Sequence, residues 1–168
     1  MNIVSTGLLL SRERLNIGCV GSHTQGVCSE PDGYDETFSD RFARLLERTG
    51  MAARVERRLL DFPQVPDEVD RADVVVLHRV VCCYPDYERL LGAAASKSDR
   101  LLVFSHPPRN VATTTVLWWD NARRRVKGDS FRTFADPPAA MLGVLSECGL
   151  RNTYRWRGFG WHVVGLER

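Results

Sequence analysis

The sequence predicts an α/β protein built around a mostly parallel sheet. Residues 73–79 (DVVVLHR) form a continuous run of β-branched and apolar side chains, typical of a strand that is buried on both faces. A second buried run follows at residues 100–105 (RLLVFS), and a helix fits between the two at residues 87–95. Buried strands that alternate with helices favour a parallel sheet with right-handed crossovers.

A helix and a strand are expected before these elements. Apolar side chains recur at spacings of three and four between residues 38 and 46, and Gly50 suits the end of that helix. Residues 54–61 then favour a strand, which Pro63 and Pro66 prevent from continuing.

The later elements have clear starting or stopping signals, with proline near a start and glycine after an end. They are a helix at residues 113–126, a helix that opens at Pro137 and Pro138 and ends at Cys148 before Gly149, and strands at residues 153–157 and 161–166. The last two strands are joined by the turn Gly158-Phe159-Gly160, so a closing hairpin is expected to add an antiparallel edge to the sheet.

Length and composition fit one globular domain. The chain has 168 residues, of which 43% are hydrophobic and 26% charged. Turn-forming residues dominate residues 1–42, so we expect a poorly defined amino-terminal segment, partly loop, before an α/β domain at residues 43–168. The net charge of +2 is too small to indicate a nucleic-acid-binding surface by itself, and no apolar stretch is long enough to span a membrane. Neither kind of partner is expected, and without a leader-like segment the expected location is the cytoplasm.

The five cysteines contain no CxxC pair, which argues against a structural zinc site, and no metal is expected. Cys82 and Cys83 are expected to be small buried hydrophobic residues rather than nucleophiles, because no general base stands beside them. Trp118, Trp119 and Phe131 are expected to lie in the core or in a wall beside a substrate.

Two motifs in residues 54–168 resemble the second half of a class I S-adenosylmethionine-dependent methyltransferase. Asp61 and Phe62 stand where that family has a strand-terminal acid followed by an apolar residue. There the carboxylate accepts a hydrogen bond from the adenine amino group and the apolar side chain packs on the ring. Residues 72–86 (ADVVVLHRVVCCYPD) resemble the family's fourth strand and the loop that borders the methionine moiety of the cofactor.

The resemblance implies S-adenosylmethionine as cofactor, bound by Asp61, Phe62, His78, Arg79 and Val80. These positions follow strands, and ligands of open α/β sheets bind beyond the carboxyl ends of the strands. Segments near the carboxyl terminus, residues 131–141 and 161–168, also resemble a bacterial subgroup of small-molecule methyltransferases.

The family's first strand should run into a Gly-rich turn, with a ribose-binding acid about 20 residues later. One candidate is the stretch LNIGCVG, with Gly18 and Gly21 in the turn and Asp35 as the acid. It departs from the family at Asn16, where an acid is usual, and at Val20, where a glycine is usual.

A second interpretation is that the Gly-rich turn has been lost. Residues 28–43 resemble a helical segment that precedes the Gly-rich strand in the bacterial subgroup. The first two strands would then be deleted between Ala43 and Arg44, and residues 1–27 would be unrelated lead-in sequence. The predicted fold is a Rossmann-like methyltransferase sheet whose first strands are missing or degraded, with an exposed edge through which copies of the chain could pair.

These features bear on three possible functions. The first is an S-adenosylmethionine-dependent methyltransferase with a small-molecule acceptor and impaired activity, whose catalytic residues stay unassigned; His78 and His106 are candidate bases by position alone. The second is a non-catalytic remnant that acts as a protein-binding module. A different nucleotide-binding α/β enzyme is disfavoured, because the sequence has neither GxxxxGK[ST] nor GxGxxG.

Overall fold

The computed structural model describes residues 6–10, 15–20, 44–45, 47–50, 52–129 and 132–168. The strands are β1 (Thr6–Leu10), β2 (Leu15–Val20), β3 (Val55–Leu60), β4 (Ala72–His78), β5 (Ser98–His106), β6 (Arg151–Arg157) and β7 (His162–Glu167). The helices are α2 (Tyr87–Lys97), α3 (Val111–Val126) and α4 (Pro138–Glu147), with 3-10 turns η1 (Ala52–Arg54), η2 (Pro66–Glu68) and η3 (Val81–Cys83).

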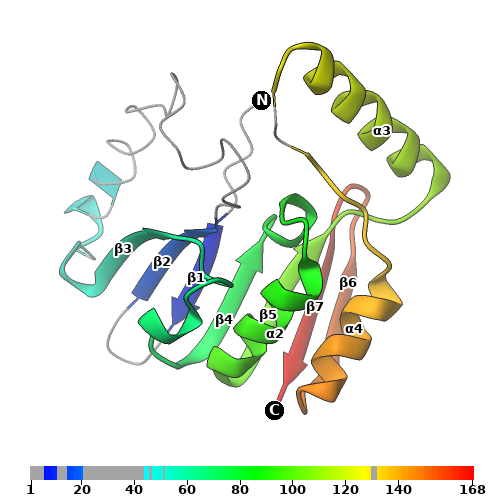
Figure 1. The fold of residues 1–168 in the computed structure, drawn as a ribbon. Helices are drawn as coiled ribbons and strands as arrows, with labels where there is room; N and C mark the ends of the chain where they lie inside the picture. The colour runs from blue at the N-terminus through cyan, green and yellow to red at the C-terminus, as the bar shows by residue number, and fades with distance from the viewer. Residues whose placement is uncertain (1–5, 11–14, 21–43, 46, 51, 130–131) are drawn as a thin grey trace.

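The seven strands of the described residues form one sheet in the order β3-β2-β1-β4-β5-β7-β6. The central pair β4 and β5 is parallel, while β7 runs antiparallel to both β5 and β6. The predicted α/β class and the antiparallel carboxyl-terminal edge are therefore confirmed (Figure 1).

The first two strands form an antiparallel hairpin. Four residues separate β1 from β2, and Leu10 pairs with Leu15. Strand β1 is also antiparallel to β4, whereas β2 is parallel to β3. Two strands from the amino-terminal segment thus lie in the same sheet as the rest of the chain. The described structure thus has a short antiparallel hairpin between β3 and β4, in the segment that was expected to be poorly defined.

One face of the sheet is covered by α2 and α4, which pack against each other as well as on the sheet (Figure 1). Their fully buried side chains include Leu90, Leu91, Met141 and Leu145. These meet alternate side chains of the central strands, namely Val75 and Leu77 of β4, Leu102 and Phe104 of β5, and Val164 and Leu166 of β7. The period of two places each of these strand residues on the same face.

The second face of β4 is covered less completely than the sequence predicted. Val75 and Leu77 are buried, but Val74 and Val76 are only half-buried. Among the described helices, α2 and α4 share one face, and α3 lies beyond the edge at which β4 ends (Figure 1). The expectation of burial on both faces was therefore wrong for this part of the chain, since the run of valines reflects β propensity as much as two-sided burial.

The helix ends follow their sequence signals. The Asp86 carboxylate accepts from the backbone N–H of Arg89 at 3.0 Å and caps α2, and the Asn110 side chain accepts from that of Thr113 at 2.8 Å and caps α3. Gly149 follows α4 with a φ of 82°, a conformation that glycine adopts without steric cost. None of the described helices is both long and apolar enough to cross a membrane.

Candidate functional site

Three strand ends meet along one edge of the sheet. Strands β3, β4 and β5 point in the same direction, because β2 is parallel to β3 and is separated from β4 by the single reversed strand β1. The residues that follow these strands, beginning with Asp61 and Arg79, therefore lie at one edge, which we call the carboxyl edge. This is the edge at which α/β sheets bind ligands.

Asp61 is held by a residue that the sequence did not single out. Its Oδ1 accepts a hydrogen bond of 3.0 Å from the hydroxyl of Tyr84, which is 5% exposed. Its Oδ2 is buried and has no hydrogen-bond partner among the described residues. The turn after β3 uses the backbone carbonyl of Asp61, which accepts from the N–H groups of Gln64 and Val65. The side chain is thus free of the turn and directed into the protein.

The Tyr84 hydroxyl keeps its proton firmly. Burial, the hydrogen bond to Asp61 and the charge of that carboxylate together raise the pKa of Tyr84 to about 12. Tyr84 follows η3, and the sequence carries no signal that would pair it with a residue 23 positions earlier.

Phe62 and Val80 are core residues. Phe62 is 4% exposed and Val80 is 1% exposed, and both belong to the main hydrophobic cluster. Little of the Phe62 ring is therefore left for a ligand in this conformation. Their assignment to a cofactor site stays a prediction.

His78 and Arg79 are organised by Ser105, near the end of β5. The backbone N–H of Arg79 donates to Ser105 Oγ at 2.9 Å, and Ser105 Oγ lies 3.2 Å from His78 Nδ1. Because the Ser105 oxygen accepts from Arg79, its hydrogen is available to His78 Nδ1. Arg79 has a φ of 57°, unusual for a residue with a side chain, and this sharp turn separates β4 from η3.

The charge of Arg79 lies over an aromatic ring. Its guanidinium carbon is 4.8 Å from the ring centroid of Trp161, which is also a tilted neighbour of His78. Burial lowers the pKa of His78, and the positive charge of Arg79 lowers it further. His78 is therefore expected to be a neutral imidazole at pH 7.

The two adjacent cysteines occupy η3. Cys82 is 2% exposed, and its Sγ lies 3.4 Å from that of Cys83. The hydrogen bond with Cys83 and burial strongly raise the pKa of Cys82, so the thiolate that a nucleophile needs is not formed. The expectation that Cys82 is a buried hydrophobic residue is confirmed, and Cys83 is half-buried.

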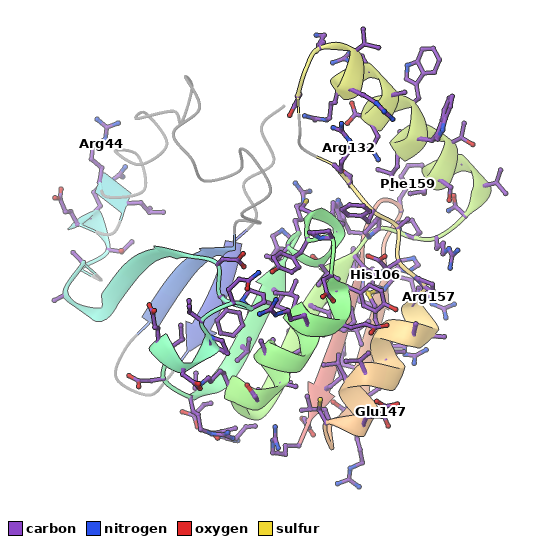
Figure 2. All side chains as sticks on the ribbon, in the orientation of Figure 1. Arg44, His106, Arg132, Glu147, Arg157 and Phe159 are labelled. Atoms are coloured by element: carbon purple, nitrogen blue, oxygen red, sulfur yellow. The ribbon has the colours of Figure 1, made fainter. Side chains whose placement is uncertain are left out.

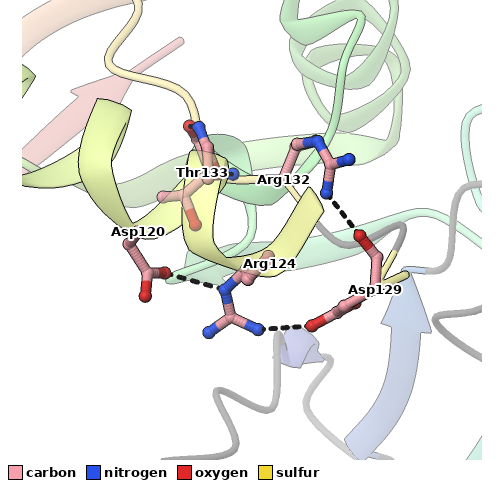
Figure 3. A network of polar contacts seen from close by, with 6 residues as sticks. Asp120, Arg124, Asp129, Arg132 and Thr133 are labelled. Atoms are coloured by element: carbon pink, nitrogen blue, oxygen red, sulfur yellow. Dashed lines mark hydrogen bonds and ion pairs between the residues drawn. The ribbon is translucent and has the colours of Figure 1, made fainter. Parts of the chain in front are cut away.

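Helix α3 is tied to the segment that follows it (Figure 3). The Asn121 side chain donates to the Thr133 carbonyl at 2.8 Å and accepts from the Thr133 N–H at 3.0 Å. Arg124 forms ion pairs with Asp120 at 2.7 Å and Asp129 at 2.8 Å. The next residue after Thr133, Phe134, donates its N–H to the carbonyl of Cys82, which brings this segment to the carboxyl edge.

The tryptophans of α3 were misassigned from the sequence. Trp118 is 67% exposed and Trp119 is 69% exposed, so the expectation that they lie in the core was wrong. Helix α3 contains no buried residue, because it stands outside the layer formed by α2 and α4. Phe131 lies outside the described residues.

The strand pairing locates one residue of the Gly-rich candidate, whose assignment to a cofactor site stays a prediction. Gly18 lies within β2, opposite Gly7 of β1 and Arg58 of β3, so it is not part of a turn. The strand beside β4 is β1, and its carboxyl end, Leu10, pairs with Val74 at the opposite edge. Hence none of the described residues forms a Gly-rich turn between a first strand and the carboxyl edge. Gly21 and Asp35 lie outside the described residues.

No group of three or more potential metal ligands among His, Cys, Asp and Glu comes together in the described part of the chain.

Comparison with solved structures identifies the fold. Over about 77% of the chain it is similar to class I S-adenosylmethionine-dependent methyltransferases. Magnesium protoporphyrin IX methyltransferase from Synechocystis PCC 6803 with bound SAH matches with a TM-score of 0.57 at 16% identity, over 77% of this chain and 58% of that one. An O-methyltransferase family protein from Burkholderia thailandensis matches with a TM-score of 0.60 at 17% identity, over 79% and 41% of the two chains.

A third match is an O-methyltransferase family 2 protein from Planctomyces limnophilus DSM 3776 in complex with apigenin. Its TM-score is 0.56 at 20% identity, over 77% of this chain and 39% of that one. No protein-family model matches the chain, and no curated protein matches it. The likeness is therefore one of fold, and the chain spans between about two fifths and three fifths of these three structures.

Proposed function

We propose that this chain is an S-adenosylmethionine-dependent methyltransferase that acts on a small molecule. The observation that carries the proposal is the Asp61 carboxylate, whose Oδ2 is buried without a partner among the described residues. A buried acceptor without a donor is costly, by about 1–3 kcal/mol. A ligand amino group, such as that of adenine, would satisfy it.

The neighbouring residues support the same reading. Tyr84 fixes the other oxygen of Asp61, so Oδ2 is held in place for a ligand donor. His78 and Arg79 stand at the end of the next strand in the sequence, at the same edge. The fold is one in which structural neighbours bind SAH or SAM.

The cofactor, when bound, supplies a methyl group on a sulfonium centre. This chain's own residues would bind and orient it: Asp61 at the amino group, and His78 and Arg79 on the side of the methionine moiety. The described residues offer no Gly-rich turn at which the backbone could approach the cofactor closely. We therefore expect a weaker affinity for S-adenosylmethionine than in a methyltransferase that has this turn.

Calorimetric titration with S-adenosylmethionine tests the proposal. We expect saturable binding at millimolar ligand or below, and an affinity about tenfold lower in Asp61→Ala, since a hydrogen bond to a charged group is worth at least about 1.5 kcal/mol. Asp70→Ala is the matched control, because Asp70 is an exposed aspartate far along the turn from β3 to β4. Absence of saturable binding, or equal losses in both variants, would contradict the proposal.

A second function is favoured by the reversed strand β1. Because β1 ends at the opposite edge, no turn after β1 can reach a cofactor at the carboxyl edge. This arrangement favours a non-catalytic, methyltransferase-like protein that binds a partner. Within the described residues, β3 and β6 are the outermost strands of the sheet. An open edge strand presents unpaired backbone groups with which a strand of a partner could pair.

Sedimentation and cofactor titration on one sample separate the two functions. A chain that sediments as a monomer at all concentrations and binds S-adenosylmethionine supports the methyltransferase. A chain that self-associates and shows no cofactor binding supports the partner-binding module.

A further inference from the structure

A cavity lies away from Asp61, toward the β6 end of the sheet. It has a volume of about 280 Å³ and is lined by β5, β6, β7 and the first turns of α4. Its lining includes none of Asp61, Tyr84, His78 or Arg79. The cavity is therefore distinct from the site proposed for the cofactor.

The strand register explains the chemistry of the cavity floor. Phe104 of β5 is opposite Val164 of β7, which is opposite Arg155 of β6. One step further toward the carboxyl edge, His106 is opposite His162, which is opposite Arg157. Directly opposed residues project to the same face of a sheet, so both rows face the cavity. Each row is apolar or aromatic across β5 and β7 and ends in an arginine on β6. Figure 2 labels His106 and Arg157, the two ends of the second row.

The remaining walls complete an apolar pocket with a positive rim. Pro138 and Leu142 of α4 close one side, and Arg109, which follows β5, stands on another. The lining contains three arginines and no Asp or Glu. None of Arg109, Arg155 and Arg157 takes part in an ion pair within the part of the chain that the structure describes.

Nearby polar groups leave this positive rim in place. Arg155 Nε donates to the Asn152 side chain at 2.7 Å, a neutral partner. The positive charge of Arg109 acts to lower the pKa of Asp136, but burial has the larger effect and raises it. The His106 Nδ1 lies 2.9 Å from the Pro107 carbonyl, which makes Nδ1 the donor and fixes the ring.

We propose that this cavity binds a small organic carboxylate with an apolar ring or branched chain. Guanidinium groups recognise carboxylates through paired, charge-assisted hydrogen bonds, and the half-buried side chains of Pro138 and Leu142 offer apolar surface to the rest of the ligand. Pockets for drug-sized ligands have volumes of roughly 300–1,000 Å³, so a volume of about 280 Å³ limits the ligand to about one ring. The inference stands on the cavity itself and does not depend on methyl transfer.

Titration of the full chain with benzoate, by calorimetry or ligand-observed NMR without S-adenosylmethionine, tests this site. We expect saturable millimolar binding of benzoate, at least about tenfold weaker binding of neutral benzamide, and no binding of benzylamine. Inorganic phosphate should bind more weakly than benzoate, because it makes no use of the apolar floor. Equal binding of benzoate and benzamide, or tighter binding of phosphate, would overturn the proposal.

Variants locate the binding. Arg157→Met and Arg109→Met should each weaken benzoate binding roughly three- to tenfold, since the two guanidinium groups are exposed and partly screened. Arg151→Met is the matched control, because Arg151 is an exposed arginine at the other end of β6 and does not line the cavity. Leu142→Phe should also reduce binding by filling the cavity. An unchanged affinity in both Arg157→Met and Arg109→Met, in protein with an unchanged melting temperature, would refute the site.

Discussion

The hydrogen bond between Tyr84 and Asp61 is the contact on which the proposed cofactor site most depends. Tyr84→Phe removes the hydroxyl and leaves the shape of the side chain unchanged. The lost bond is 3.0 Å long, joins a hydroxyl to a carboxylate, and involves a tyrosine that is only 5% exposed. We therefore expect Tyr84→Phe to lower the free energy of unfolding by about 1.5–3 kcal/mol, the range for a hydrogen bond to a charged group.

The stabilisation that Tyr84 contributes should decrease at alkaline pH. The pKa of Tyr84 is raised to about 12 in the folded protein, from an ordinary value of 10.0. Folded protein therefore holds this proton more tightly than unfolded protein does, so the stabilisation is complete below pH 10 and is lost as the pH rises from 10 through 12. In Tyr84→Phe this component is absent, and the difference in stability between the two proteins should shrink over the same interval.

Urea unfolding of a double-mutant cycle provides the measurement. Tyr84→Phe, Asp61→Ala and the double variant should give a coupling energy of about 1.5–3 kcal/mol at pH 7. Tyr87→Phe is the control, because Tyr87 donates to its neighbour Glu88 at the surface, and its loss should leave stability unchanged within error. A coupling energy below about 0.3 kcal/mol would show that Tyr84 does not hold Asp61 in solution.

Three further predictions concern the rest of the described structure. Leu145→Ala should lower the free energy of unfolding by about 2–4 kcal/mol in urea titration, because Leu145 is fully buried between α4 and the sheet. Val144→Ala, on the half-buried side of α4, should lower the free energy of unfolding by less. Asn121→Ala should speed hydrogen exchange at the Thr133 amide at least about fivefold while leaving global stability nearly unchanged, because Asn121 is its partner; an unchanged exchange rate would mean that α3 does not anchor this segment. The midpoint of the NMR titration of His106 should lie below the ordinary value of 6.5, because burial lowers the pKa of this side chain. Its contribution to stability should then be complete above pH 6.5 and decrease as the pH falls, and a midpoint above 6.5 would contradict the burial of the ring.

The sequence predicted the second half of the fold well because each element there has a local signal. The valine run of β4, the proline-marked starts of α2 and α4, and the glycine after α4 all act within a few residues. The β1–β2 hairpin was missed as a unit. Its strands are short, and the apolar run of β1 fits more than one kind of structure. Direction within a sheet is set by long-range pairing, which a periodicity cannot reveal.

The candidate site was predictable only in outline. Asp61 and His78 could be placed at the carboxyl edge because each follows a strand. Their partners, Tyr84 and Ser105, lie 23 and 27 positions away, and nothing in a single sequence indicates such contacts. The exposure of Trp118 was missed for a related reason: an apolar helix face predicts burial only if another element covers it, and α3 extends past the sheet edge.

The arrangement of β1 and β2 restricts how this chain could hold a nucleotide. Backbone donors for a cofactor have to emerge at the carboxyl edge, close to Asp61. Strand β1 ends at the opposite edge, but β2 is parallel to β3 and ends beside it, with Val20 opposite Leu60. Among the described strands on the Asp61 side of β4, β2 is therefore the one whose carboxyl end could lead into such a turn. A turn after β2 would hold the cofactor one strand further from His78 and Arg79 than a turn after the strand next to β4. Methyl transfer depends on alignment of the reacting atoms to within about an ångström. This sheet could therefore bind S-adenosylmethionine without using it in catalysis. An affinity measured by calorimetry has to be followed by a methyl-transfer assay before activity is inferred.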